Sequence, residues 1–319
     1  MLLSGPKSCQ ENEAVSAERP TSRSGSHPTS DCIGQTRSAE STSRHMLLRT
    51  KNGPLYYELD GDGPPLVFVS GWAMSCECWR PAVAMLKQRH RCMIYDSRGV
   101  ARSQPFSVSA SFTIEDHAED LHALLEAVEM FDATIIGHEM GSQIAAVDID
   151  RHPQDMSSLI VVSPRRGLSQ DDVRNLAVFT PASLALRELA AYPLLRNLVA
   201  RRFRRAPQPY RDRVFTDFAE LSPRAAYETA LSASTGEAVL DDVIARTTSS
   251  ILFVCGEKDK KGAEEARRLF SLARAGKLAT MRDCGFLPML EYRRQFVKLV
   301  EDFVSGPKGT ANRGAILTF

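Results

Sequence analysis

The chain has 319 residues, of which 43% are hydrophobic and 25% are charged, a balance typical of a globular protein with a sizeable core. Its formal net charge is +1, so the overall charge does not favour nucleic acid or an anionic membrane as a partner. No apolar run reaches the roughly 18 residues that a membrane-spanning helix needs. The opening Met1-Leu2-Leu3 is too short for the core of a signal peptide, and a cytoplasmic protein is expected.

Residues 1–45 are rich in Ser and Thr and show neither a strand nor a helix period. Such a segment cannot bury enough apolar surface to offset the entropy of ordering it, so it is predicted to be a disordered N-terminal extension. Met46-Leu47-Leu48 repeats the opening triplet, and a translational start at Met46 would agree with this.

From residue 46 to 164, strand patterns alternate with helix patterns. A hairpin is predicted in "LLRTKNGPLYYELDGDG", with Asn52 and Gly53 in the positive-φ positions of its turn. The later strands are "PLVFVS", "CMIYDSRG", "ATIIG" and "SSLIVVSP". Helices are predicted near 79–87, after the N-cap residue Thr113, and from 141 to 152, where Pro153 ends the helix. This alternation predicts an α/β fold whose mostly parallel sheet is flanked by helices on both faces.

Residues 165–235 are helical in pattern and contain no convincing strand. Alternation returns over 236–304, so the intervening block is predicted to be a helical cap inserted in one α/β domain, and 305–319 a flexible tail. A basic cluster in the cap has two open interpretations, a solvated helix face or a gate for an anionic ligand. The cluster comprises Arg201, Arg202, Arg204 and Arg205.

Five segments, in order, resemble the α/β-hydrolase fold family with a helical cap. They are "VFVSGWAMS", "YDSRGVARS", "GHEMGS", "LFVCGEKD" and "DCGFLPMLEYRRQFVKLVEDFV". The third resembles the nucleophile elbow, a sharp strand-to-helix turn that normally carries a serine. In this chain the central residue is Glu139.

The resemblance also implies the other positions of the site. Asp259 falls at the triad acid and Phe286 at the position of the histidine base, while the backbone N–H groups of Trp72 and Met140 would form the oxyanion hole. The remaining pocket residues expected are Ser70, Gly71 and His138, together with Phe286. The pocket is predicted to be mainly apolar and to bind a small organic molecule.

Two side chains near the elbow are expected to have structural roles. His138 precedes the nucleophile position and should point away from the cleft, and Ser142 should pack in the elbow helix. The seven cysteines include a lone Cys76-x-Cys78 but no pair of C-x-x-C units, so neither a disulfide framework nor a zinc site is predicted. No metal and no cofactor are expected, and a homo-oligomer is left open.

Three functions remain open because serine and histidine are both replaced. Glu139 could transfer protons in a lyase, isomerase or cyclase, with Asp259 close enough to couple to it. The site could instead be a relic in a protein that binds a ligand or partner without catalysis. Carboxylate attack by Glu139 is the third route, although Phe286 cannot activate the water that would hydrolyse the resulting ester. Ordinary serine hydrolysis is rejected.

Overall fold

The structure is a computed structural model that describes residues 44–166, 205–235, 237–306 and 315–318. Most of the predicted extension and the Arg201–Arg204 part of the basic cluster lie outside these ranges. Within them, the longest helices fall short of the length and apolar character that crossing a membrane requires.

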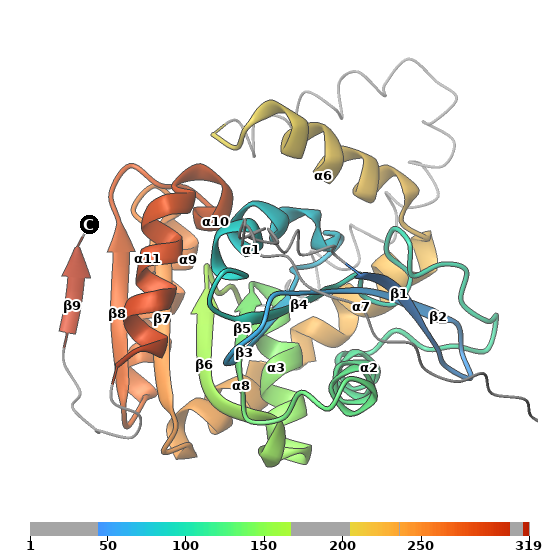
Figure 1. Cartoon of the computed structure of the whole chain (residues 1–319), viewed down its shortest axis with the longest axis horizontal. Coiled ribbons are helices and arrows are strands. Elements are labelled where there is room, and N and C mark those ends of the chain that lie inside the picture. The colour runs from blue at the N-terminus through green and yellow to red at the C-terminus, as the bar shows by residue number, and fades with distance from the viewer. Residues whose placement is uncertain (1–43, 167–204, 236, 307–314, 319) are drawn as a thin grey trace, which may run out of the picture. The chain divides into compact units, whose positions relative to one another are not determined.

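The described residues form a nine-stranded sheet in the order β1-β2-β4-β3-β5-β6-β7-β8-β9. Pairing is antiparallel between β1 and β2 and between β2 and β4, and parallel from β4 through β9. Figure 1 shows the parallel strands side by side between helices. The strands are β1 (Arg44–Arg49), β2 (Pro54–Asp60), β3 (Pro65–Val69), β4 (Arg91–Tyr95), β5 (Ala133–His138), β6 (Met156–Val162), β7 (Ser250–Gly256), β8 (Gly276–Met281) and β9 (Ala315–Thr318).

Helices cover both faces of this sheet, as the alternating pattern predicted. On one face α2, α3, α8 and α9 pack on the strands, and on the other α1, α10 and α11 do so. The helical segments are η1 (Cys76–Cys78), α1 (Arg80–Leu86), α2 (Ile114–Ala127), α3 (Met140–Arg151), η2 (Pro153–Asp155), α6 (Gln208–Glu220), α7 (Pro223–Thr235), α8 (Glu237–Arg246), α9 (Lys260–Leu272), α10 (Pro288–Glu291) and α11 (Arg293–Val304).

The central strands are buried on both sides because successive residues point to opposite faces. In β3, Leu66 and Phe68 enter the core beneath α1 and α11, whereas Val67 and Val69 enter the core beneath α2 and α3. Both faces are therefore apolar, which explains why these strands appear in the sequence as continuous hydrophobic runs.

Local signals at two elements had different outcomes. Thr113 caps α2 as predicted, and it forms a capping box with Asp116. The hairpin between β1 and β2 exists, but neither Asn52 nor Gly53 has a positive φ. Instead, Thr50 Oγ1 accepts hydrogen bonds from the N–H groups of both residues, at 3.2 Å each. A side-chain-organised loop of four residues replaces the expected two-residue turn.

The predicted boundaries need two corrections. Arg44 and His45 belong to β1 and pair with Leu59 and Glu58, so the structured domain begins before Met46. Residues 315–318, expected in a flexible tail, form β9 and pair with β8. Since β8 would otherwise present a row of unpaired backbone groups, adding a strand to that edge satisfies them.

The described part of the predicted cap, α6 and α7, is helical and lies between β6 and β7 in the chain. By contrast, α8 contributes Leu240, Val243 and Ile244 to the core beside α3. Residues 167–204 of the expected cap are outside the described ranges. The division of the chain into core and cap therefore stays a prediction.

Candidate active site

The turn from β5 into α3 has the strained geometry of a nucleophile elbow. Glu139 has φ 51° and ψ −115°, a conformation that L-residues rarely adopt. Two glycines permit the close packing around it. A Cβ on Gly141 would lie 2.3 Å from the carbonyl oxygen of Val69, and one on Gly137 would lie 2.6 Å from the backbone carbon of Gly141. The backbone therefore keeps the elbow although the side chain at its tip is a carboxylate.

The Glu139 carboxylate lies against the loop that follows β3. Its Oε2 accepts a hydrogen bond of 2.9 Å from the backbone N–H of Trp72, one of the two donors predicted for an oxyanion hole. Gly71 makes this approach possible, because a Cβ there would lie 2.8 Å from the same oxygen. The protein's own carboxylate thus engages the Trp72 donor that a serine hydrolase would offer to its substrate.

The second predicted donor, Met140, is the first residue of α3. The positive end of the helix dipole at this N-terminus stabilises negative charge. Met140, Gly71 and Trp72 line a narrow cavity with about 10 Å³ of space for the centre of a water molecule, which is room for about one water. The other lining residues are Ala73, Ser97, Arg98, Val100, His117, Leu221, Ala225 and Thr229. The lining of this cavity is therefore mixed, with apolar, cationic and hydrogen-bonding side chains.

Asp259 follows β7, as predicted, and is buried at the start of α9. Its Oδ1 accepts a hydrogen bond of 2.5 Å from the guanidinium of Arg165, whose side chain is 13% exposed. The same guanidinium lies over the ring of Phe286, 4.5 Å from its centroid. Arg165 therefore takes the partner role at Asp259 that the family resemblance assigns to a histidine.

Arg165 was not among the candidate residues predicted from the sequence. It comes two residues after Ser163, which has φ 44° at the end of β6, and nothing in "SPRRG" indicates that it reaches Asp259. The expected coupling between Asp259 and Glu139 stays a prediction, and the structure gives Asp259 a cationic partner in Arg165.

His138 has a structural contact, as expected for the residue before the elbow. It is fully buried, and its Nε2 lies 3.0 Å from the backbone oxygen of Phe286. Since a carbonyl only accepts hydrogen bonds, Nε2 carries the proton. The two rings also meet edge to face, with centroids 4.6 Å apart. This pair fixes the segment after β8 against the elbow.

Two singled-out hydroxyl groups bond to backbone oxygens. Ser70 Oγ donates to the backbone oxygen of Ser75 at 3.3 Å, and Ser142 Oγ donates to that of Gly137 at 2.8 Å. Both hydroxyls are fully buried, so they serve packing. Burial raises the pKa of the Cys76 and Cys78 thiols, which disfavours the reactive thiolate form.

Two histidines of α2, His117 and His122, have partners other than Glu139. His117 Nε2 lies 3.3 Å from Thr229 Oγ1, and burial lowers the pKa of His117 to about 3. His122 bonds with Asp155 at 2.7 Å. Of the basic cluster, Arg205 is described, and it donates to the backbone oxygen of Asp283.

Residues 64–260, more than half of the chain, match the family model of the alpha/beta hydrolase fold. Together with the sheet order and the elbow, this shows that the chain belongs to the α/β-hydrolase fold family. Similar folds occur in a bromoperoxidase from Bacillus anthracis, at 18% identity and TM-score 0.69, covering 83% of this chain and 100% of that one. An esterase from Exiguobacterium antarcticum gives 18% identity and TM-score 0.68, covering 80% and 96%.

Curated relatives are similar over shorter stretches. A putative carbamate hydrolase RutD from Variovorax paradoxus is 33% identical over 113 residues, which are 34% of this chain and 42% of the relative. A cis-3-alkyl-4-alkyloxetan-2-one decarboxylase from Shewanella oneidensis is 30% identical over 122 residues, 38% of each protein. The chain spans about two-fifths of the length of these relatives, and their names describe different reactions.

Proposed function

We propose that this α/β-hydrolase is a non-hydrolytic acid–base enzyme in which Glu139 transfers protons on a small organic substrate. The observation that carries the proposal is the position of the Glu139 carboxylate, held at the elbow by the Trp72 N–H at 2.9 Å. Ordinary hydrolysis is disfavoured because Glu139 and Phe286 stand at the positions of serine and histidine. In a well-studied triad, loss of either group costs on the order of 10⁶ in turnover.

The proposed step moves one proton. Glu139 accepts it from an acidic C–H or O–H of the substrate, and the electron pair stays on the substrate as an enolate or alkoxide. Protonation removes the negative charge from Oε2 and so weakens its hold on the Trp72 N–H. That donor, with the N–H of Met140, then faces a substrate anion of the kind an oxyanion hole stabilises. Return of the proton to another atom of the substrate completes an isomerisation. In an elimination, the electron pair instead expels a leaving group, to which Glu139 gives the proton.

The pair of Arg165 and Asp259 supports this role without taking part in the proton transfer. It places a guanidinium over Phe286, where a hydrolase would need a neutral base. A fixed cation cannot activate water as a base because arginine stays protonated, but it favours a substrate that develops negative charge.

The second candidate function is a binding protein without catalysis. The hydrogen bond between the Trp72 N–H and Glu139 also supports this candidate. A carboxylate that satisfies the Trp72 N–H internally leaves that donor no role toward a ligand. Attack by Glu139 as a nucleophile, the third possibility, lacks a base for the hydrolysis of the ester, since Phe286 stands where one is needed.

The test is proton exchange in heavy water. Small ketones, lactones and apolar carboxylates are first screened for stabilisation of the protein, and ¹H NMR then follows exchange of the acidic protons of each stabilising compound. Wild type and a Glu264→Gln control, altered at an exposed acid on α9, should exchange the compound. Glu139→Gln should bind it but lose exchange by at least about 10²-fold, the usual size of a general-base contribution.

The outcomes separate the candidates. Binding without exchange in the wild type identifies the non-catalytic protein. In that case Glu139→Gln should leave stability unchanged or raise it, because glutamine avoids a half-buried charge. Equal exchange by wild type and Glu139→Gln contradicts the role given to Glu139. Efficient hydrolysis of an activated aryl ester by the wild type contradicts the non-hydrolytic assignment altogether.

A further inference from the structure

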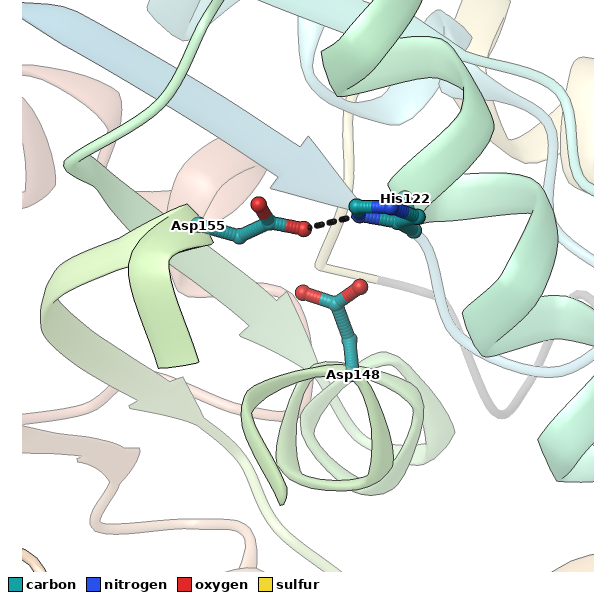
Figure 2. Close-up of side chains that lie close together, drawn as sticks. All are labelled: His122, Asp148 and Asp155. Atoms are coloured by element: carbon teal, nitrogen blue, oxygen red, sulfur yellow. Dashed lines mark hydrogen bonds and ion pairs between the residues drawn. The ribbon is translucent and has the colours of Figure 1, made fainter. Parts of the chain in front are cut away.

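A cluster of three potential metal ligands lies at the end of α3 opposite the elbow. His122 comes from α2, Asp148 from the last turns of α3 and Asp155 from η2, and Figure 2 shows the three side chains converging. One ligand atom from each lies within 4.8 Å of those from the other two. Asp148 is nine residues beyond Glu139, about 13 Å along the helix at 1.5 Å per residue, so this cluster is separate from the candidate active site.

The two carboxylates are buried with too few protein partners. Asp148 and Asp155 are fully buried, and one Asp155 oxygen bonds His122 Nδ1 at 2.7 Å. Among the described residues, no donor reaches the other Asp155 oxygen or either oxygen of Asp148, whose carboxylate points into the space between His122 and Asp155 (Figure 2). A buried carboxylate without a partner is costly, and such groups are normally paired or coordinate a metal.

We propose that His122, Asp148 and Asp155 bind one divalent transition-metal ion, for which Zn²⁺ is the suitable probe. One imidazole nitrogen and two carboxylate oxygens form a mixed ligand set that suits zinc better than magnesium or calcium, which prefer oxygen alone. The two carboxylate charges are neutralised by a divalent cation. Three protein ligands also leave a fourth position for water, as in other zinc sites with three ligands.

The geometry can accommodate an ion with small movements. Bonds of about 2.0–2.2 Å to a common centre place ligand atoms roughly 3–3.5 Å apart. The contact between His122 and Asp155 must widen from 2.7 Å, while Asp148 closes on the same point. The ion would replace the hydrogen shared by His122 and Asp155, because a ligating imidazole nitrogen carries no proton.

The surroundings favour both the ring orientation and the positive charge. His152 stacks on His122 with ring centroids 3.5 Å apart and planes within 3°, which restrains the rotation of the ligand ring. The cluster also lies at the C-terminal end of α3, where the helix dipole attracts cations. An ion there would fasten α2, α3 and the turn before β6 to one another and stabilise the fold.

The competing occupant is a proton. Burial, together with the neighbouring Asp155 and Glu119, raises the pKa of Asp148 to about 9, so a protonated Asp148 beside the hydrogen bond of His122 and Asp155 is the metal-free alternative. The two occupants predict different responses to added metal.

The experiment uses the full chain, purified with chelator and then dialysed free of it. Zn²⁺ binding is measured by native mass spectrometry and by thermal unfolding, with Mg²⁺ as a comparison ion. The variants are Asp148→Asn and His122→Ala, and the matched control is Glu126→Gln, an exposed acid on α2. Circular dichroism verifies that each variant is folded.

Wild type and Glu126→Gln should bind one Zn²⁺ per chain and unfold roughly 5 °C higher when free Zn²⁺ is about a hundredfold above its dissociation constant. Asp148→Asn and His122→Ala should each lose the bound ion and this shift, and Mg²⁺ should give much less. If either variant does not fold, the absorption spectrum of Co²⁺ bound to the wild type reports the ligand set. Absence of a bound Zn²⁺ in the wild type, an equal shift in folded Asp148→Asn, or a Co²⁺ spectrum of a hexa-aqua ion overturns the proposal.

Discussion

Replacing Arg165 by methionine should destabilise the protein strongly, because Asp259 would then remain buried without its cation. The ion pair is short, at 2.5 Å, and the side chains of Arg165 and Asp259 are only 13% and 4% exposed. The second oxygen of Asp259 has no other partner among the described residues. Breaking such a buried pair from one side typically costs about 3–5 kcal/mol, and loss of the contact with the Phe286 ring adds about 0.5–1 kcal/mol.

A double-mutant cycle isolates the interaction from these other losses. The free energy of unfolding in urea is measured for Arg165→Met, Asp259→Asn and the double variant. The coupling energy should be about 2–4 kcal/mol, since removal of both charges also removes the buried unpaired group. The control cycle uses Lys298 and Asp302, an ion pair on α11 at 2.9 Å whose side chains are 70% and 57% exposed. Its coupling should be about 0.3–0.5 kcal/mol.

A cost of under about 1 kcal/mol for Arg165→Met, or a coupling to Asp259 as small as that of the exposed pair, would contradict this prediction. Either result would mean that Arg165 does not replace a histidine as the partner of Asp259. The electrostatic support that we assign to the candidate active site would then have to come from another group.

Three further predictions concern the elbow, the cap of α2 and the buried histidine. Gly141→Ala should lower the free energy of unfolding by about 3 kcal/mol or greatly reduce soluble yield, because the added Cβ would lie 2.3 Å from the Val69 carbonyl oxygen. An unchanged melting temperature would contradict the tight packing of the elbow. Thr113→Ala should lower the free energy of unfolding by about 1 kcal/mol, or the melting temperature by roughly 2–4 °C, because the capping box of α2 is lost. The control is Ser107→Ala, and an equally large effect of that substitution would argue against a capping cause. Burial lowers the pKa of His117 to about 3; the charge of Arg98 lowers it further, and that of Asp116 opposes the shift. The unfolded chain therefore binds more protons than the folded protein between about pH 6.5 and pH 3. The contribution of His117 to stability is complete above pH 6.5 and falls by up to about 1.4 kcal/mol per pH unit below it. His117→Gln should reduce that acid-side slope in urea titrations at several pH values, and an unchanged slope would show that other groups cause it.

Local patterns in the sequence were sufficient to predict the α/β architecture and the position of the elbow. A continuous hydrophobic run such as that of β3 indicates a strand buried on both faces. This feature can be predicted because it depends only on residues that are neighbours in the sequence. Gly137 and Gly141 flank Glu139 at fixed spacing, and a sharp turn with close packing needs small residues at those positions. Thr113 could also be identified as an N-cap, since capping involves neighbours three residues away.

Other features depended on contacts between distant parts of the chain. The hydrogen bond from Trp72 to Glu139 joins residues 67 positions apart, and the ion pair of Arg165 and Asp259 joins residues 94 apart. The contact between His122 and Asp155 spans 33 positions, with Asp148 arriving from a third element. No sequence motif has those spacings, so the sequence patterns indicated neither a metal site nor a role for Arg165. Only the packing of helices on the sheet brings these charges into a buried, low-dielectric setting, where each must find a partner.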